Sequence, residues 1–502
     1  MGDLLKHPLW QGQDLGSPLP DNEFGVSVSL PLWRHVIGYE EKDPEVVSKF
    51  RSGYPRFCCP PAVSDLFRAA ENRFADQGER CLVFPRAVHA ERCLSFIAGA
   101  GFAGRVAVLG EEELGVAVFP EAAYDKARHF WRFCGEVVST RQACHALGRV
   151  STSVSVEEGK SAQMEIRARL AGLSGQSSED VFLFPSGMAA SFAVHRMLTS
   201  LFPDRKTVQL DFPYVDVLKL QERFGSGVHF FPLVNESEYG DIENLMRGEK
   251  LAGVFCEAPS NPLLKCVDFE RLQKIIADTQ PGLPLVVDDT IATVVNVDAF
   301  RVADVVTTSL TKAFSGTGDV MAGSVILNRK SPHYAAFSAF LNAESDHEIW
   351  RGDAVALEKN SRDFAERVAV MSRSSVGLYE YLRSHPRIDK IWHSVTQGGP
   401  GYSHIQRADG GHGCLVSFTL RDPEKSSPAF YDALEVCKGP SLGTRFTLAC
   451  PYTLLAHYDE LEWAESCGAD RYLIRVSVGL EPLTELVARF ERALSQCESK
   501  TT

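Results

Sequence analysis

The sequence has no long apolar run. None of its uninterrupted apolar stretches approaches the ~20 residues that a membrane-spanning helix needs. The opening stretch MGDLLKHPLW also contains no apolar segment of signal-peptide length. These absences argue against a membrane protein and predict a cytoplasmic one.

Basic residues are in short supply as well. Lysine and arginine total 52 against 65 aspartates and glutamates, which gives a net charge of −13. A protein that binds nucleic acid through its phosphates needs a basic face, so nucleic acid is not an expected partner. The 13 cysteines include no C-x-x-C pair, which argues against a disulfide framework and against a zinc site. No metal is expected.

The proportions of hydrophobic and charged residues are those of a globular protein. The 502 residues are 44% hydrophobic and 23% charged, and this length is enough for two or three domains. From about residue 176 the chain repeats a short β-branched run, then small or polar residues, then a helix-like segment, which is α/β alternation. We interpret residues 1–150 as an N-terminal arm and extension, 151–384 as the α/β domain and 385–502 as a smaller C-terminal domain.

The stretch ADVVTTSLTKAFSGTGDVMAGSVILN, residues 303–328, contains the most informative lysine. Its first and last apolar runs predict buried strands, so Ser309, Thr311 and Lys312 follow the carboxyl end of a strand. Open α/β sheets bind ligands at that edge. Burial lowers the pKa of a lysine, and the neutral amine can then form an imine with a carbonyl. This stretch alone leaves open the alternative of a surface lysine after a strand.

Four earlier predicted strands also end on small or polar residues. In chain order these are Ser186 with Gly187, Tyr214, Asn261 and Asp288. We expect all of them at the same sheet edge as Lys312. The start of a helix at Gly187 suits a phosphate, and a carboxylate such as Asp288 at the end of a buried strand needs a partner, for which a pyridinium N–H is suitable. A simple helix cap is the alternative at both places.

Two short motifs do not carry the function that they suggest. GAGFAG, residues 99–104, fits G-x-G-x-x-G, but a helix-like segment precedes it and a strand-like one follows, the reverse of a dinucleotide site. GPSLG, residues 439–443, fits the hydrolase G-x-S-x-G, but no acid lies between Ser441 and the one downstream histidine, His457. Further on, Arg475 stands on an apolar strand, where it needs a carboxylate from a salt bridge or from a substrate.

Six segments together resemble a known family. FPSGMAA, EAPSNPLL, VVDDT, TSLTK, GPSLGT and LIRVSVGLE are similar, in this order and spacing, to the successive signatures of the cystathionine γ-synthase family, enzymes of cysteine and methionine metabolism that use pyridoxal 5′-phosphate (PLP). The resemblance covers residues from about 25 to 497. It implies fold type I: a large, mostly parallel sheet domain flanked by helices, plus a smaller C-terminal α+β domain.

The resemblance also implies roles for the strand-end residues. Lys312 would hold PLP covalently and later move protons, Asp288 would face the ring nitrogen, Tyr214 would stack on the ring, and Asn261 would contact the ring hydroxyl. A carboxylate at the ring nitrogen keeps it protonated, which strengthens PLP as an electron sink. The residues implied to hold the phosphate are Gly187, Met188, Ser309 and Thr311.

Four more residues receive roles from the same resemblance. Arg475 with Ser441 would take the α-carboxylate of an amino-acid substrate, since an arginine can bind a carboxylate through two hydrogen bonds. Tyr54 and Arg56, in GYPRF, match the Tyr-x-Arg that in this family reaches the phosphate of a neighbouring subunit. A homodimer or homotetramer with shared active sites is therefore expected. The role of the cysteine pair that follows Arg56 stays open.

The expected reaction is γ-substitution on an O-acyl-L-homoserine, with cysteine as nucleophile and cystathionine as product. Departures from the family pattern, such as Asp289 where asparagine is usual, Pro440 in place of a glutamate-containing turn, and SGTGD after Lys312 where bacterial members carry a histidine, resemble the fungal branch. CCPPAV after GYPRF departs even from that branch. The alternatives are a secondary-metabolite paralogue that adds a carbon or nitrogen nucleophile to a vinylglycine-type intermediate, a γ- or β-lyase, and a non-catalytic member. The identity of the acyl group is also open.

Overall fold

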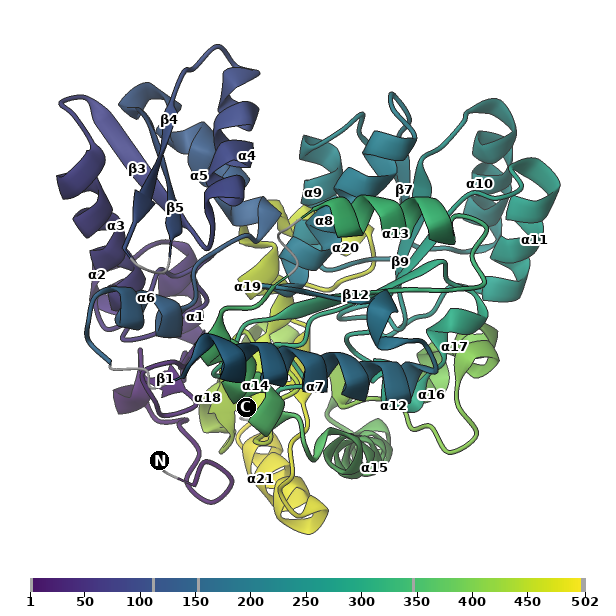
Figure 1. Ribbon diagram of the computed structural model, residues 1–502. Helices are drawn as coiled ribbons and strands as arrows, with labels where there is room; N and C mark the ends of the chain where they lie inside the picture. The colour runs from purple at the N-terminus through teal and green to yellow at the C-terminus, as the bar shows by residue number, and fades with distance from the viewer. Residues whose placement is uncertain (1–2, 111–112, 151–153, 345–347, 498–502) are drawn as a thin grey trace.

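A seven-stranded sheet forms the centre of the computed structural model, which describes residues 3–110, 113–150, 154–344 and 348–497 (Figure 1). The strand order is β6-β12-β11-β10-β9-β7-β8. All neighbouring pairs are parallel except those of β12, which runs antiparallel to both β11 and β6. In that order the strands are Val181–Phe184, Gly323–Leu327, Val305–Thr308, Leu285–Asp288, Gly253–Glu257, Thr207–Leu210 and Val228–Phe231. The predicted mostly parallel sheet is confirmed.

Alternation of side chains explains why this sheet is covered on both faces. Val286 packs with helices α8 (Gly187–Leu201) and α13 (Tyr334–Ala343), whereas its neighbours Leu285 and Val287 belong to the core on the opposite face. Several helices contribute to that second core. Among them are α7 (Val156–Ser174), α10 (Glu236–Gly248), α11 (Phe269–Thr279) and α14 (Arg351–Asn360). Parallel sheets are buried on both faces, and the continuous apolar strands of this sequence fit that rule.

The C-terminal part of the chain builds a second sheet, of order β13-β14-β17-β16-β15. Its strands are Ile388–Trp392, Leu415–Leu420, Ile474–Ser477, Leu448–Pro451 and Cys437–Lys438. One core joins this sheet to helices α15 (Phe364–Arg383), α18 (Pro423–Ala433) and α21 (Leu483–Ser495). The N-terminal helix α1 (Trp33–Glu40) packs on the same core, with the Trp33 ring 6.0 Å from that of Tyr431. The arm therefore folds back onto its own chain.

A third, smaller sheet stands apart as an N-terminal lobe (Figure 1). Its order is β3-β5-β4, and its strands are Glu79–Phe84, Leu114–Pro120 and Arg105–Leu109. Three helices cover it: α3 (Pro61–Phe74), α4 (Ala87–Ala98) and α5 (Tyr124–Cys134). The GAGFAG segment joins the end of α4 to the start of β4, so the order helix–glycines–strand is confirmed, and this is not the arrangement of a dinucleotide site.

The helical pattern of residues 353–384 is divided between two helices, because residues 361–363 separate α14 from α15. Asp363 at this break bonds to Arg445, a contact from the C-terminal part that periodicity does not reveal. The glycine-rich segment 397–413 contains helix α17 (Gly399–Ile405), which has Pro400 in its first turn, a position where proline is favoured. Among the described residues, no helix is long and apolar enough to cross a membrane.

Candidate active site

Five strand ends meet at one edge of the large sheet. Strands β6, β11, β10, β9 and β7 run in one direction, because β12 is antiparallel to both of its neighbours and the other pairs are parallel. Their carboxyl ends therefore lie at the same edge. The residues at or just beyond these ends are those singled out from the sequence: Gly187, Lys312, Asp288, Asn261 and Tyr214. The prediction that these segments share one edge is confirmed.

Lys312 lies just beyond the end of β11 with its amine inside the site. Its Nζ is 3.3 Å from the Ser441 hydroxyl and 5.8 Å from the centre of the Tyr54 ring. Burial, and then the positive charges of Arg475 and Arg56, lower the pKa of Lys312 to about 7. A large fraction of this amine is therefore neutral near pH 7, and a neutral amine is the form that attacks a carbonyl.

The first turn of α8 forms a cradle that suits an anion. A Cβ on Gly187 would come within 2.7 Å of the Ser309 Cβ, so only glycine lets the helix start and the lysine loop approach this closely. The Ser186 hydroxyl accepts a hydrogen bond from the Ala189 amide (3.1 Å) and donates one to the carbonyl of Gly135 (2.7 Å). The remaining first amides of a helix have no partner within it, and together with the helix dipole they favour a phosphate.

The rest of the predicted phosphate set surrounds this turn. Met188 is the second residue of α8, and the Ser309 amide donates a hydrogen bond to the Thr290 hydroxyl oxygen at 2.8 Å. Thr311 is buried and fixed by the backbone of Ala322, whose amide donates to its hydroxyl at 3.1 Å. The four residues thus come from the start of α8 and from the lysine loop, which lie against each other at Gly187 and Ser309. The cradle fits the phosphate of a cofactor such as PLP.

Two carboxylates occupy neighbouring strand ends. Asp288 accepts hydrogen bonds from the Thr290 amide at 2.8 Å and from the Thr307 hydroxyl at 3.4 Å. Glu257, which the sequence interpretation missed, stands opposite it in the β9–β10 register. Burial raises the pKa of both groups, and the Asp288 charge raises the pKa of Glu257 further. A cation near Asp288, such as a protonated ring nitrogen, would relieve this repulsion.

Glu257 also connects two of the predicted residues. One of its oxygens accepts a hydrogen bond from the Tyr214 amide at 2.6 Å, and the other accepts one from the Asn261 amide at 3.0 Å. The position of this glutamate directly at the end of a strand, in EAPSNPLL, is the signal that could have revealed it. Asp289, by contrast, points away toward the Thr308 hydroxyl at 2.5 Å, and burial raises its pKa to about 7.

Arg475 places a buried guanidinium on the C-terminal side of the site. Strand β17 carries it, and the side chain is only 3% exposed. Its guanidinium donates to Asn261 Oδ1 at 3.1 Å and to the carbonyls of Ser441 at 2.9 Å and Pro440 at 3.1 Å. Within the described part of the chain, no group accepts from its buried Nε. Since no carboxylate neutralises this arginine there, it can receive the carboxylate of a substrate.

Tyr54 and Arg56 lie at the same edge within this chain. Arg56 Nη2 donates to the Tyr214 hydroxyl at 2.8 Å, and Nη1 lies 2.8 Å from Asp216. The Tyr54 ring lies beside Lys312. Asp216 thus pairs with Arg56 inside the chain, and the expected contact with the phosphate of a neighbouring subunit stays a prediction.

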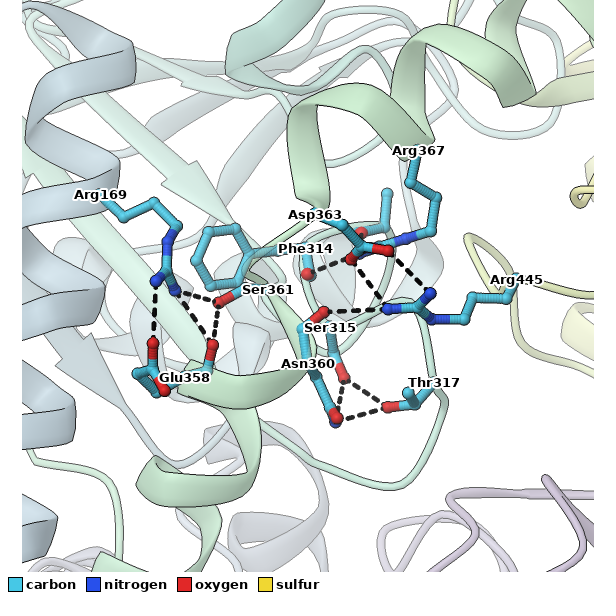
Figure 2. Close-up of polar contacts among 11 residues, drawn as sticks. Arg169, Phe314, Ser315, Thr317, Glu358, Asn360, Ser361, Asp363, Arg367 and Arg445 are labelled. Atoms are coloured by element: carbon cyan, nitrogen blue, oxygen red, sulfur yellow. Dashed lines mark hydrogen bonds and ion pairs between the residues drawn. The ribbon is translucent and has the colours of Figure 1, made fainter. Parts of the chain in front are cut away.

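The loop after Lys312 is held by a network of polar contacts (Figure 2). Arg367 donates to the carbonyls of Ala313 at 2.9 Å and Phe314 at 3.0 Å. Asp363 accepts hydrogen bonds from Arg367 and from Arg445, the latter at 2.8 Å to each of its oxygens. Helix α15 and the C-terminal part of the chain therefore fix the segment that carries the lysine.

A second group in the same network holds the far end of that loop. Asn360 Nδ2 donates to the hydroxyls of Ser315 at 3.3 Å and Thr317 at 2.6 Å (Figure 2). It also donates to Asp319 at 3.0 Å. The segment SGTGD, where bacterial family members were expected to carry a histidine, is thus tied to the end of α14. None of these supporting residues was recognised from the sequence, because their partners lie more than 40 positions away.

Fold and site together define an α/β enzyme built around a lysine amine at the carboxyl edge of a parallel sheet. The sequence pattern described as "Cys/Met metabolism PLP-dependent enzyme" matches residues 159–495, and that described as "Fungal trans-sulfuration enzyme, N-terminal domain" matches residues 62–139. The chain belongs to the Cys/Met metabolism family of PLP-dependent enzymes. The resemblance to this family is confirmed, and the second match covers the N-terminal lobe.

Individual relatives agree with this assignment. The chain is 32% identical to a cystathionine gamma-synthase of Neurospora crassa, over 97% of this chain and 99% of the relative. It is also 32% identical to a cystathionine gamma-synthase-like enzyme of Amanita muscaria, over 97% of this chain and 98% of the relative. A crystal structure of cystathionine gamma synthase from Xanthomonas oryzae superposes with a TM-score of 0.57, at 21% identity, over 69% of this chain and 89% of that one. This last likeness supports the fold.

Proposed function

We propose that the protein binds PLP covalently at Lys312 and catalyses γ-substitution on an O-acyl-L-homoserine, with cysteine as the nucleophile. The observation that carries the proposal is the pairing of Lys312, whose pKa is lowered to about 7, with Arg475, whose buried Nε has no acceptor in the described part of the chain. An amine that attacks a carbonyl and a cation that binds a carboxylate are what an enzyme needs to hold an aldehyde cofactor and an amino acid together.

The other residues of the edge support this assignment. PLP, when bound, supplies an electron sink for carbanions at the substrate carbon next to the nitrogen. The Asp288 carboxylate, at the end of β10, would accept a hydrogen bond from a protonated ring nitrogen, and the first amides of α8, at Gly187 and Met188, are suited to a phosphate. Ser309 and Thr311 complete that cradle. Tyr214 and Asn261, fixed by the two oxygens of Glu257, would contact the ring and its hydroxyl.

The substrate side of the site follows from Arg475 and Lys312. Arg475 would orient the amino acid by its α-carboxylate, with Ser441 nearby. Once the substrate amine displaces it, the Lys312 amine would move protons at the substrate carbons, a role that its lowered pKa suits because a general base works best near the operating pH. Loss of the acyloxy group would then leave a carbon chain that a nucleophile can attack.

The test uses the acyl-homoserine first without and then with a nucleophile. With O-acetyl- or O-succinyl-L-homoserine alone, we expect slow release of the acyl group and formation of 2-oxobutanoate. Added cysteine should divert this flux to cystathionine, measured by chromatography of the products. If neither acyl-homoserine is turned over by protein that holds PLP, γ-substitution is wrong.

A second candidate keeps the cofactor and changes the nucleophile. The chain has the same sequence identity, 32%, to the cystathionine gamma-synthase of Neurospora crassa and to the cystathionine gamma-synthase-like enzyme of Amanita muscaria. Sequence identity therefore does not decide whether cysteine is the nucleophile. The same experiment separates the two. If cysteine leaves 2-oxobutanoate unchanged while a carbonyl compound or an amine suppresses it and yields an adduct, a carbon or nitrogen nucleophile is the physiological one.

A further inference from the structure

We propose that Tyr452 positions two groups of the site relative to each other: its ring holds the Arg475 guanidinium, and its hydroxyl holds the side chain of Asn261. This inference rests on the proposed function, because Arg475 and Asn261 receive their roles there. Tyr452 itself lies outside the six segments that predicted the site. It directly follows strand β16 as the first residue of helix α19 (Tyr452–Ala456), and it is only 4% exposed.

The ring of Tyr452 lies against the guanidinium of Arg475. The Arg475 Cζ is 4.9 Å from the ring centre, within the ~6 Å over which an aromatic face attracts a cation. Both side chains are buried, and this attraction is stronger where water is excluded. Burial raises the pKa of the Tyr452 hydroxyl, so the side chain is uncharged near neutral pH. The ring therefore holds the guanidinium without neutralising it, and the positive charge stays available for a substrate carboxylate.

The hydroxyl of Tyr452 fixes the orientation of the Asn261 amide. Arg475 donates to Asn261 Oδ1 at 3.1 Å, and Asn261 Nδ2 donates to the Tyr452 hydroxyl at 3.3 Å. A guanidinium has donors only, so the amide oxygen must face Arg475 and the amide nitrogen must face Tyr452. This nitrogen carries two N–H groups. The second one can donate to the ring hydroxyl of the cofactor, the contact that the proposed function assigns to Asn261.

The contacts of Tyr452 also join the two large sheets at the site. Asn261 follows β9 of the seven-stranded sheet, where Glu257 accepts from its backbone amide at 3.0 Å. Tyr452 belongs to the C-terminal part, because its own amide donates at 3.0 Å to the carbonyl of Leu473, two residues before Arg475. The Tyr452 hydroxyl donates back to the carbonyl of Asn261 at 3.5 Å. A change at Tyr452 should therefore affect both the cofactor side and the substrate side of the site.

The role of the ring is tested with two matched ligands and the protein loaded with PLP. L-2-Aminobutanoate has an α-carboxylate, 1-aminopropane is the same molecule without it, and neither carries a leaving group. We would titrate each ligand and follow the visible absorption band. The dissociation constant of 1-aminopropane divided by that of L-2-aminobutanoate measures recognition of the carboxylate. In Tyr452→Leu we expect this ratio to fall about 5- to 30-fold from its wild-type value, because Arg475 is no longer held in place.

The role of the hydroxyl is tested with Tyr452→Phe, which keeps the ring. We expect the carboxylate ratio to stay within about two-fold of wild type. The PLP affinity of the chain freed of cofactor should fall about 3- to 10-fold, because the Asn261 amide loses the acceptor that fixes its nitrogen. Unchanged PLP affinity in Tyr452→Phe would show that the hydroxyl has no such role. This variant nearly preserves the volume of the side chain, so it tests the proposal even if Tyr452→Leu does not fold.

Tyr239→Leu is the matched control. Tyr239 is also buried, with the Arg271 guanidinium 4.2 Å from its ring centre and a hydroxyl that accepts from the Asp268 amide at 2.8 Å. These partners belong to helix α11 and its N-cap, outside the site. The control should lower the melting temperature and leave the carboxylate ratio and PLP affinity unchanged. If Tyr452→Leu keeps the wild-type ratio, or if Tyr239→Leu lowers it equally, Tyr452 does not position Arg475.

The outcome is independent of the reaction that the protein catalyses. Since neither ligand has a leaving group, an absence of turnover with acyl-homoserines would refute γ-substitution without changing the carboxylate ratios. If the wild-type protein binds no PLP, the inference is wrong together with the proposed function. If the wild-type protein binds PLP but binds 1-aminopropane as tightly as L-2-aminobutanoate, the role of Arg475 is wrong and the inference falls with it.

Discussion

Glu257 and Asp288 face each other as register partners at the carboxyl ends of β9 and β10. Glu257 is only 7% exposed, and its two oxygens fix the backbones of Tyr214 and Asn261. Two acids at adjacent strand ends, both with raised pKa values, form an arrangement that favours a bound cation. This relationship makes Glu257 the supporting residue that connects three strand ends of the site.

Glu257→Gln should therefore impair the enzyme without unfolding it. Glutamine has one acceptor oxygen and cannot accept from both amides, and an unmade buried hydrogen bond costs about 1–3 kcal/mol. We expect kcat/KM to fall about 10- to 100-fold, with a changed pH profile of the visible absorption band. The control is Glu238→Gln, because Glu238 also accepts from two backbone amides, those of Leu233 and Val234, outside the site. If both variants keep wild-type kcat/KM, the role of Glu257 is wrong.

Lys312→Ala should abolish covalent cofactor binding. The wild-type protein with PLP is expected to be yellow, with a visible band that borohydride bleaches, whereas the variant should lack this band when no amine is added. Lys438→Met is the matched control, since burial also lowers the pKa of Lys438 to about 7, but its amine donates to the carbonyls of Pro31 and Asp432 away from the site. If the band persists in Lys312→Ala and disappears in Lys438→Met, the cofactor is attached to Lys438 and the assignment to Lys312 is wrong.

The rate of PLP attachment should depend on pH through Lys312. A lysine whose folded-state pKa is lowered loses its proton at lower pH, so the neutral, reactive amine becomes the main form above about pH 7, instead of above the ordinary ~10.4. Stopped-flow absorption of the chain freed of cofactor should show a rate that rises up to about pH 7 and then levels off. The same measurement with Nα-acetyl-lysine, which keeps a free side-chain amine, corrects for the ionisation of PLP itself. A rate that keeps rising to pH 10 would contradict the lowered pKa.

Asp288 and its neighbour should differ sharply on substitution. Asp288→Asn is expected to retain some PLP but to lower kcat by orders of magnitude, because the ring nitrogen loses the carboxylate that keeps it protonated. Asp289→Asn should be much milder, since Asp289 bonds to Thr308 and not into the site. Steady-state kinetics of the two variants, with PLP content measured on the same samples, decides the matter. Losses of equal size would show that the two acids do not have separate roles.

Gly316→Ala should disturb the lysine loop through Arg367. Gly316 has φ +69°, and a Cβ there would lie 2.4 Å from Arg367 Nε, so the guanidinium that holds the loop carbonyls must shift. We expect a loss of about 1–3 kcal/mol in urea unfolding and weaker PLP binding. Gly399→Ala is the control for backbone strain alone, because Gly399 has φ +55° with open space around it. If the two variants are equally destabilised, the contact with Arg367 adds nothing beyond the strain.

The fold could be predicted to a large extent because its signals are local. A run of β-branched residues such as 305–308 forms a buried strand wherever it lies, and the polar residues behind it follow at the strand end. The positions at which helices begin and end could be predicted less well. The break between α14 and α15 depends on Asp363 and its partner Arg445, 82 residues away, and periodicity within one segment carries no information about such a partner.

The sequence by itself determined which residues stand at the edge of the sheet, since Asp288 ends its strand and Lys312, Asn261, Tyr214 and Gly187 each follow theirs by a few positions. Only the tertiary structure decided which groups meet there. The pairing of Glu257 with Asp288 arises from the register of two strands, and the contact of Arg56 with Tyr214 spans 158 positions. Both relationships depend on how segments far apart in the chain pack together, and local sequence patterns carry no information about that packing.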